Sequence, residues 1–288
     1  MPRKPPPLDQ EKYEQDEDGM PREIVGSWAR EKYERVKRYT KISGGVRKNW
    51  YKGGTAGASY IELYCGPGRV RVEDSKEVMH GSPLVAWTES VADNSPFTQV
   101  HVADSDARIV DAVERRLKTA IAPVQIEIGP AVETVDRVIK KLNPYGLHFV
   151  FLDPYNLAAL PFEIVRKLAL LKRIDILIHV SVQDLNRNLR RYIQQKNSPL
   201  DTFAPGWRNG LDTARSDQYV RGKFMEHWRS LIKDEKMKTA EVAELVTGEM
   251  QQPLYWLAFA ARHDRALEFW EKIRYLDADP QESLFTTT

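Results

Sequence analysis

Residues 60–68 carry the most informative segment of the chain, Tyr60-Ile61-Glu62-Leu63-Tyr64-Cys65-Gly66-Pro67-Gly68, an apolar strand pattern that ends in an acid and a Gly-X-Gly turn. Glycines allow a sharp turn and let backbone N–H groups come close to a ligand. The acid at the strand end can accept hydrogen bonds from a cationic or hydroxyl-bearing group. The segment therefore predicts a nucleotide-type cofactor site.

Glycine spacing separates several kinds of nucleotide site. A Walker loop requires Gly-x-x-x-x-Gly-Lys-Ser/Thr, which is absent, and a dinucleotide fingerprint requires a third glycine where this chain has Arg71, which disfavours an NAD-dependent enzyme. The remaining pattern, acid-x-aromatic-x-Gly-x-Gly, resembles that of class I S-adenosylmethionine (SAM) methyltransferases and is matched by Glu62, Tyr64, Gly66 and Gly68. The resemblance implies SAM as the cofactor, with Glu62 facing its methionine ammonium.

Apolar runs and helical patterns alternate along the following residues. We expect five strands, at about residues 58–65, 98–103, 124–128, 147–152 and 174–180. Helices fit between these strands, and further helices are expected at about 183–195 and 219–234. Two last apolar runs, 240–247 and 253–261, have the pattern of an antiparallel pair. The sequence therefore predicts an α/β fold with a doubly wound, Rossmann-like seven-stranded sheet of the class I methyltransferase type, in which the last two strands are antiparallel.

Composition divides the chain into segments. We expect a disordered acidic, proline-rich tail at 1–22, a basic N-terminal helical segment at 23–57, a methyltransferase-like domain at 58–275 with an insertion at about 197–217, and a flexible C-terminal tail at 276–288.

Overall charge and cysteine content narrow the classes of protein. With 43 basic and 41 acidic residues, the net charge of +2 neither demands nor excludes a nucleic-acid partner. Cys65 is the single cysteine, so an internal disulfide is excluded, and no His/Cys cluster has the spacing of a zinc site. No apolar run is long enough to span a membrane, and the N-terminus lacks the apolar core of a signal peptide. We therefore expect a cytoplasmic protein without a membrane anchor.

Asp104 follows the second expected strand. In a SAM site this acid binds the ribose, because a vicinal diol presents two donors that one carboxylate can accept together. More residues separate Asp104 from the glycines than a plain βαβ unit requires. An inserted loop at 69–80 accounts for the additional residues. Alternatively, Asp104 and Ser105 cap the next helix.

Asp153-Pro154-Tyr155-Asn156 follows the fourth expected strand, at the edge where open α/β sheets place their chemistry. The segment resembles the Asp-Pro-Pro-Tyr motif of amino-methyltransferases with one proline missing. The resemblance implies that Asp153 and the Pro154 carbonyl accept hydrogen bonds from a target amine, that Tyr155 stacks on a flipped base, and that Asn156 lies beside the substrate. Alternatively, the segment is an ordinary strand-to-helix turn.

Two further segments could border such a cleft. Ser82 and Pro83 are a natural N-cap and first residue of a helix, whose free N–H groups could meet a carboxylate. Segment 183–187, with Asp184 and Arg187, either lines the opposite wall of the cleft, with Arg187 at the substrate, or forms a solvated helix pair.

Basic residues concentrate between Arg30 and Lys52, beside Trp50 and Tyr51. This stretch could bind the phosphates of RNA or DNA while Trp50 or Tyr51 stacks on a base. Alternatively, it is simply a solvated helix face.

Taken together, these segments resemble the three-Cys-motif partner proteins, a prokaryotic family with a class I methyltransferase-like fold. The resemblance rests on residues 60–69, 81–84, 152–155 and 184–187, and on 253–257 followed by Trp270, and spans roughly residues 30–275. The family usually has Asp and Phe where this chain has Glu62 and Tyr64. The resemblance implies a SAM pocket and a three-cysteine, radical-SAM-like protein as a partner.

Two functions follow from these residues. The leading hypothesis is a SAM-dependent N-methyltransferase that acts on an amino group of a nucleic-acid base. Its cofactor residues are Glu62, Tyr64, Gly66, Gly68 and Asp104, and its catalytic residues are Asp153, Pro154 and Tyr155. The alternative is a non-catalytic or weakly catalytic partner protein that keeps the fold, which the missing proline favours.

Overall fold

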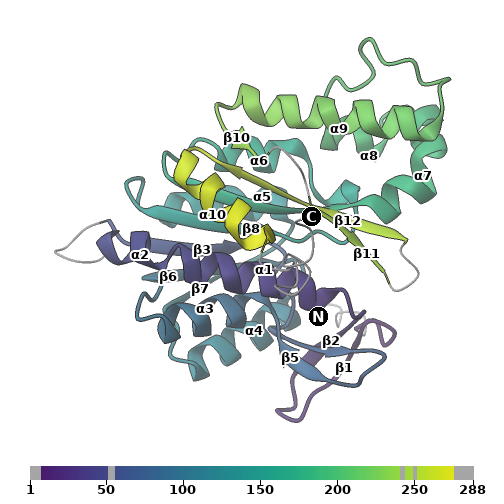
Figure 1. Cartoon of the computed structure of the whole chain (residues 1–288). Helices are drawn as coiled ribbons and strands as arrows, with labels where there is room; N and C mark the ends of the chain where they lie inside the picture. The colour runs from purple at the N-terminus through teal and green to yellow at the C-terminus, as the bar shows by residue number, and fades with distance from the viewer. Residues whose placement is uncertain (1–7, 51–55, 241–243, 249–251, 276–288) are drawn as a thin grey trace, which may run out of the picture.

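The structure is a computed structural model that describes residues 8–50, 56–240, 244–248 and 252–275. Its centre is a mixed sheet of eight strands, β3 (Ala58–Glu62), β6 (Gln99–Asp104), β7 (Val124–Ile128), β8 (Leu147–Leu152), β9 (Ile174–Ser181), β10 (Lys238–Thr239), β11 (Glu244–Thr247) and β12 (Pro253–Ala261). The strand order is β10-β12-β9-β8-β3-β6-β7, with β11 also paired to β12 (Figure 1).

Strand directions confirm the doubly wound sheet that the sequence predicts. β3 pairs in parallel with β6 on one side and with β8 on the other, and β8 pairs in parallel with β9. β12 is antiparallel to β9, and β11 and β10 are antiparallel to β12. The expected antiparallel pair of last strands is therefore β11 and β12, and β10 is an additional short strand. The winding reverses between β3 and β8, which is the position where open α/β sheets bind ligands.

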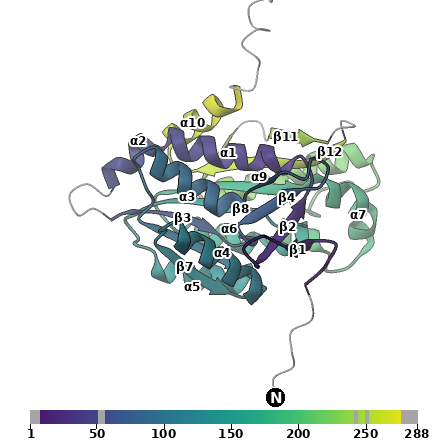
Figure 2. The same cartoon turned by 90° about the horizontal axis from the view of Figure 1, so that it is seen from below.

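Helices cover both faces of this sheet (Figures 1 and 2). One layer consists of α1 (Ala29–Ile42), α3 (Ser82–Ala92), α4 (Ala107–Thr119) and α10 (Asp264–Tyr275), with α2 (Gly44–Arg47) and the 3-10 turn η1 (Lys48–Trp50) following α1. The other layer consists of α5 (Ala131–Lys141), η2 (Leu157–Ala159), α6 (Phe162–Leu168), α7 (Val182–Gln194), α8 (Pro199–Phe203) and α9 (Asp217–Asp234). Among the described residues, no helix is long and apolar enough to cross a membrane.

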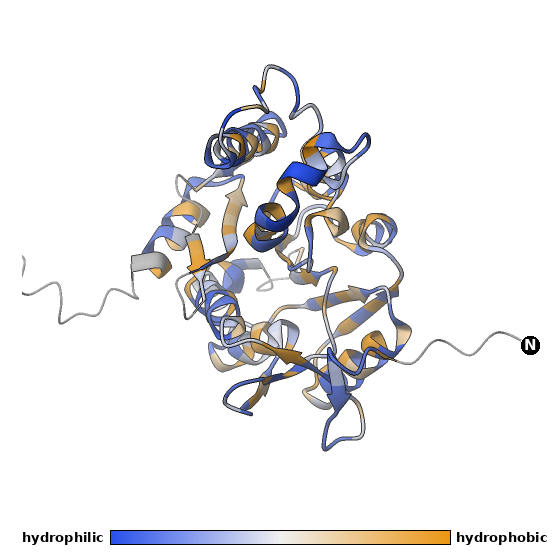
Figure 3. Cartoon of the chain, turned by 90° about the vertical axis from the view of Figure 1, so that its right-hand side faces the viewer, coloured by the Kyte–Doolittle hydropathy of each residue, from blue (hydrophilic) through white to orange (hydrophobic). Residues whose placement is uncertain are grey.

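Side chains of each strand alternate between two hydrophobic cores, as the strand period of two requires. Tyr60 and Phe149 pack under α1 and α3, whereas Ile61 and Val150 pack on the opposite face. Several helices carry hydrophobic residues along one side and hydrophilic residues along the other (Figure 3). The insertion expected at about 197–217 contributes Phe203 to the second core, so it is part of the packed domain.

A second, smaller sheet lies beside the central sheet, at the end of the molecule that also holds α7 (Figures 1 and 2). Its strands are β1 (Tyr13–Gln15), β2 (Pro21–Val25), β4 (Arg69–Val72) and β5 (Val78–His80), in the order β1-β2-β4-β5. The loop expected at 69–80 is the hairpin β4–β5.

The expectation of a disordered acidic tail at 1–22 is wrong for residues 8–22. Acids of this segment pair with Arg22, which belongs to the same segment, and with arginines from two other parts of the chain. The pairs are Glu14 with Arg22 and Arg71, Asp16 with Arg22, Arg69 and Arg116, and Asp18 with Arg116. Residues 1–7 and the expected C-terminal tail at 276–288 lie outside the described residues.

One guanidinium joins this N-terminal hairpin to the glycine turn. Arg116 of α4 is 6% exposed and bonds the carboxylates of Asp16 and Asp18. It also donates to the backbone carbonyl oxygens of Pro21, at 2.8 Å, and of Pro67, at 2.7 Å.

We predict that Arg116→Met lowers the free energy of unfolding by about 3 kcal/mol, because it leaves buried carboxylate and carbonyl oxygens without their donor. Denaturant unfolding followed by circular dichroism measures the change. Arg115→Met is the matched control, since the Arg115 side chain is 65% exposed and forms an ion pair with Asp111 one turn earlier in the same helix; it should change stability by less than about 0.5 kcal/mol. Equal midpoints for the two variants would contradict the assigned role of Arg116.

Candidate functional site

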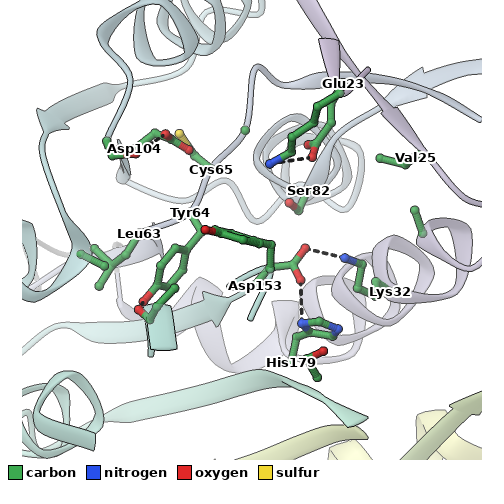
Figure 4. A pocket seen from close by; sticks show the side chains of 18 of the residues that line it. Glu23, Val25, Lys32, Leu63, Tyr64, Cys65, Ser82, Asp104, Asp153 and His179 are labelled. Carbon is green, nitrogen blue, oxygen red and sulfur yellow. Dashed lines mark hydrogen bonds and ion pairs between the residues drawn. The ribbon is translucent and has the colours of Figure 1, made fainter. Parts of the chain in front are cut away.

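A cavity of about 810 Å³ lies at the carboxyl ends of β3, β6, β8 and β9. This volume is in the range of small-molecule and cofactor sites. Residues of the N-terminal hairpin and of α1 also line it, so the cavity lies between the central sheet and the N-terminal segment. Figure 4 shows the side chains that line it.

The glycine turn has the geometry that the sequence predicts. Gly66 and Gly68 have φ values of 55° and 84°, in the left-handed region that favours glycine. A Cβ added to Gly68 would lie 3.0 Å from Val113 Cγ2 of α4. Gly66 and Tyr64 line the cavity, and the Tyr64 hydroxyl donates to the Ala159 carbonyl oxygen at 2.5 Å.

Asp104 ends β6 and lines the cavity. Its Oδ1 accepts the backbone N–H of Asp106 at 3.1 Å, and burial raises the pKa of its carboxyl. The N-cap of α4 is Asp106, whose side chain accepts the N–H of Arg108, so the alternative interpretation of Asp104 and Ser105 as the helix cap is wrong. The Asp104 carboxylate is thus placed where a ligand in the cavity can meet it.

Glu62 does not take the position that the sequence predicts. It is 1% exposed and is not among the described residues that line the cavity. Its Oε1 accepts the Ser82 hydroxyl at 2.6 Å and its Oε2 accepts the Tyr60 hydroxyl at 2.7 Å. Burial raises the pKa of Glu62 well above its usual value. Glu62 therefore joins β3 to α3 beneath the cavity; Ser82 is the first residue of α3, and Gly81 is its N-cap.

Another acid, Glu23 of β2, lies over the glycine turn. It lines the cavity, and a Cβ added to Gly66 would lie 3.3 Å from Glu23 Oε2. Its carboxylate pairs with Lys12 Nζ at 3.5 Å. Burial raises the pKa of the Glu23 carboxyl, and the charges of Lys12 and Lys32, which lower it, do not fully offset this increase. Sequence reasoning missed Glu23 because it belongs to a charged segment whose partners are distant in sequence.

Asp153 lies at the centre of an ionic cluster in the same cavity (Figure 4). Its Oδ2 is 2.6 Å from Lys32 Nζ of α1, and its Oδ1 is 3.2 Å from His179 Nδ1 of β9. Burial opposes ionisation, but Lys32 and His179 together hold the pKa of Asp153 below its usual value. Asp153 is therefore a carboxylate, and Lys32 also lies 5.8 Å from the ring centre of Tyr255.

His179, which the sequence interpretation missed, completes this cluster. Its Nδ1 lies 3.1 Å from the Pro154 carbonyl oxygen and 3.2 Å from Asp153 Oδ1. The ring packs edge-on against Tyr255, with centroids 4.5 Å apart. Burial lowers the pKa of His179 to about 4, and Lys32 acts in the same direction while Asp153 and Pro154 oppose it. The available signal was a histidine near the carboxyl end of a largely apolar strand.

Tyr155 lies at the cavity, as expected from the sequence. Its side chain is 76% exposed and lines the cavity, with Lys12 Nζ 5.3 Å from its ring centre. Pro154 contributes its carbonyl oxygen to His179 rather than to the cavity wall.

The expected substrate residues Asn156, Arg187 and Trp50 are not among the described residues that line the cavity. Asn156 is the N-cap of η2, where its side chain accepts the Ala159 N–H at 2.9 Å. Arg187 is exposed on α7. Trp50 packs against Arg173, whose Cζ lies 4.6 Å from the centre of the Trp50 ring. This contact lies near the amino ends of β3 and β9, so the expectation that Trp50 stacks at the site is wrong.

Most of the described cations between Arg30 and Trp50 have partners within the chain. Arg30 pairs with Glu77, Lys32 with Asp153, Arg38 with Glu34 and Lys48 with Asp93. Arg47 is 1% exposed and bonds the Ser95 carbonyl oxygen. Tyr51 and Lys52 lie outside the described residues. Most of the positive charge in the described part of this stretch is therefore paired within the chain.

Similarly, segment 183–187 is divided between two roles. Gln183 lines the cavity. Asp184 accepts the Leu157 N–H at 2.9 Å and the Tyr192 hydroxyl at 2.9 Å, so it fixes the segment after β8 to α7. Asp184 is thus bound to these two groups rather than to Arg187, and the expectation of a solvated helix pair is wrong.

Among the solved structures compared with the chain, one with a TM-score of 0.50 supports the fold. No family model matches the chain, and no curated protein matches it. A structure from Legionella pneumophila matches 84% of this chain and 91% of its own with 9% identity and a TM-score of 0.50. An O-methyltransferase from Bacillus cereus in complex with SAH matches 79% of this chain and 80% of its own, with 11% identity and a TM-score of 0.44. The N-methyltransferase NodS from Bradyrhizobium japonicum, also in complex with SAH, matches 82% of this chain and 88% of its own, with 11% identity and a TM-score of 0.42. At these identities the likeness concerns the fold alone.

We predict that His179 makes the protein sensitive to acid. Its folded-state pKa of about 4 lies below the usual 6.5, so the unfolded chain binds the proton more readily. The stability that the neutral ring contributes is present above pH 6.5 and is lost as the pH falls towards 4, up to about 3 kcal/mol. His179→Asn should therefore show a shallower loss of unfolding free energy between pH 7 and 4.5, measured by urea titration. His263→Asn, at an exposed position, should follow the wild type. Parallel pH profiles for His179→Asn and the wild type would refute this prediction.

Proposed function

We propose that this protein is a SAM-dependent methyltransferase. The observation that carries the proposal is one cavity, at the reversal point of the sheet, that joins a left-handed glycine turn, the acid that ends β6 and the Asp153-Pro154-Tyr155 segment. The glycine turn and Asp104 match the class I methyltransferase pattern at the expected strand ends, and Asp153-Pro154-Tyr155 resembles the Asp-Pro-Pro-Tyr motif with one proline missing. The fold hosts many chemistries, so the proposal rests on the site rather than on the architecture.

The residues present fit SAM. The Asp104 carboxylate can accept both hydroxyls of a ribose, and Gly66 allows the backbone to pass close to the ligand. Glu23 takes the place that Glu62 was expected to fill, as the acid available to a methionine ammonium. When bound, SAM supplies a methyl group activated by its positively charged sulfur.

The acceptor that we propose is an amino group of a nucleic-acid base. Tyr155 offers a largely exposed ring at the cavity for stacking, and Asp153 provides a carboxylate beside it. Methyl transfer by in-line displacement depends mainly on positioning. The chain's own contribution is therefore to hold the acceptor nitrogen in line with the methyl group.

Support for a polyanionic substrate comes from α7 rather than from the Arg30–Lys52 stretch. α7 starts at the cavity and exposes Arg187, Arg190 and Arg191. Arg190 bonds Asp217, whereas within the described part of the chain neither Arg187 nor Arg191 forms an ion pair. Seen from the right-hand side of Figure 1, α7 is predominantly hydrophilic (Figure 3). Its position lets a phosphate backbone lie on the helix while a base enters the cavity.

A second candidate function is a partner protein without methyltransferase activity, which would assist a three-cysteine, radical-SAM-like protein. The observation in its favour is that Asp153 and the Pro154 carbonyl already accept hydrogen bonds from Lys32 and His179. A target amine would find both acceptors occupied.

We predict that SAM binds the wild type and that Asp104→Ala weakens binding by about 10- to 100-fold, because hydrogen bonds to a carboxylate contribute about 1.5–3 kcal/mol. Isothermal titration calorimetry measures both affinities. Asp111→Ala is the control, because Asp111 is an exposed residue of α4. The absence of SAM binding to the wild type removes the proposed function. Binding without methylation of total RNA or DNA by labelled SAM favours the partner function.

We also predict that the double substitution Arg187→Ala and Arg191→Ala weakens binding to single-stranded RNA and lowers its salt dependence, with a slope smaller by about 0.7 for each phosphate that the protein no longer neutralises. Fluorescence anisotropy at several salt concentrations measures this slope. Lys37→Ala with Lys41→Ala, on the exposed face of α1, is the matched control and should bind like the wild type. A loss confined to the α1 variant would return the binding surface to the Arg30–Lys52 stretch, and an RNA affinity independent of salt would remove nucleic acid from the proposal.

A further inference from the structure

The ring of His179 occupies the place that an amine would take in the amino-methyltransferase motif. In that motif the aspartate and a proline carbonyl accept hydrogen bonds from the target amine. Here Nδ1 of His179 lies 3.2 Å from Asp153 Oδ1 and 3.1 Å from the Pro154 carbonyl oxygen. Both are acceptors, so Nδ1 must carry the hydrogen.

This arrangement fixes the state of the other ring nitrogen. Because Nδ1 carries the hydrogen of the neutral ring, Nε2 carries the lone pair. Among the described residues, Nε2 has no hydrogen-bond partner, and His179 lines the cavity. The rings of His179 and Tyr255 pack at an interplanar angle of 63° with their centroids 4.5 Å apart, and this contact limits the rotation of the His179 ring. His179 thus offers one acceptor, held in a fixed tautomer, to a ligand in the cavity.

We propose that Nε2 of His179 is the group that accepts the N–H hydrogen bond of the methyl acceptor and then takes its proton. The proposal rests on the proposed function and names a catalytic residue for it. In this role His179 contacts the amine, and Asp153 and the Pro154 carbonyl contact His179 instead of the amine. Asp153 and Pro154 then act through the ring, as the residues that orient it.

The transfer step balances. A bond forms between the methyl carbon and the acceptor nitrogen as the carbon–sulfur bond breaks, and its electron pair stays on sulfur to give S-adenosylhomocysteine. The acceptor nitrogen becomes cationic and loses its N–H proton to Nε2. The resulting imidazolium is paired with the Asp153 carboxylate, and it returns the proton to water after product release.

The electrostatics of the cluster suit this role. Burial and the charge of Lys32 lower the pKa of His179, so its ring is neutral at neutral pH and adds no positive charge beside the sulfonium of SAM. A base amine that has just received a methyl group is a strong acid, so a weak base suffices to take its proton. Lys32, 2.6 Å from Asp153, keeps the carboxylate ionised and able to pair with the imidazolium.

His179→Asn tests the proposal, because an asparagine amide can replace the Nδ1–H donor to Asp153 and Pro154 while offering no lone pair at the Nε2 position. We expect SAM affinity within about 3-fold of the wild type, and a rate of S-adenosylhomocysteine formation with total RNA at least about 100-fold lower. For His179→Ala, we expect partial recovery of this rate by added imidazole. His148→Asn, on β8 at a buried position that is not among the described lining residues, reports the effect of losing a buried histidine alone and should retain the rate.

A second measurement does not depend on activity. Nitrogen-15 NMR of labelled histidine should show Nδ1 protonated and Nε2 unprotonated for His179 at pH 7. The Nε2–H tautomer, or wild-type transfer by His179→Asn, overturns the proposal while leaving SAM binding and methylation by the wild type intact. If the wild type forms no S-adenosylhomocysteine with RNA or DNA, the proposed function fails and the role of Nε2 fails with it.

Discussion

Parallel pairing of β3 with a strand on each side is the constraint on which the site depends. Because β6 and β8 both run in the direction of β3, their carboxyl ends meet at one edge, and the helices that follow leave the sheet on opposite faces. The register places Glu62 opposite Val102 and Phe151, so that Asp104 and Asp153 each lie two residues further along. Asp104 and Asp153 therefore lie at the same height on the two sides of β3, two residues closer than Glu62 to the carboxyl edge of the sheet. This position explains why both acids line the cavity and Glu62 does not.

Much of the central fold could be predicted from the sequence. β7 and β8 are found at the expected residues, because β7 alternates apolar and polar residues and β8 is almost continuously apolar, and both patterns are typical of strands. Gly66 and Gly68 could be assigned to a sharp turn for the same local reason, and Asp104 could be placed because it directly follows a strand. All of these features depend on residues close together in the chain.

Features that depend on distant partners could not be predicted in this way. The N-terminal hairpin has the charged, proline-rich composition of a disordered segment, and only Arg69 and Arg116 supply the charges that order it. The burial of Glu62 depends on strand register and on a hydroxyl 20 residues away. His179 meets Pro154 across 25 residues, and a single histidine in an apolar strand gives no sign of such a contact.

Arg116 bonds both the N-terminal hairpin, above the cavity, and Pro67 of the glycine turn, below it. Mobile salt ions screen exposed charges strongly, but they screen the buried guanidinium of Arg116 only weakly. The attachment of the hairpin to the turn should thus persist at ionic strengths that weaken contacts with arginines on the surface of α7. Ionic strength then separates two properties of the same molecule, the shape of its cavity and its attraction for a polyanion.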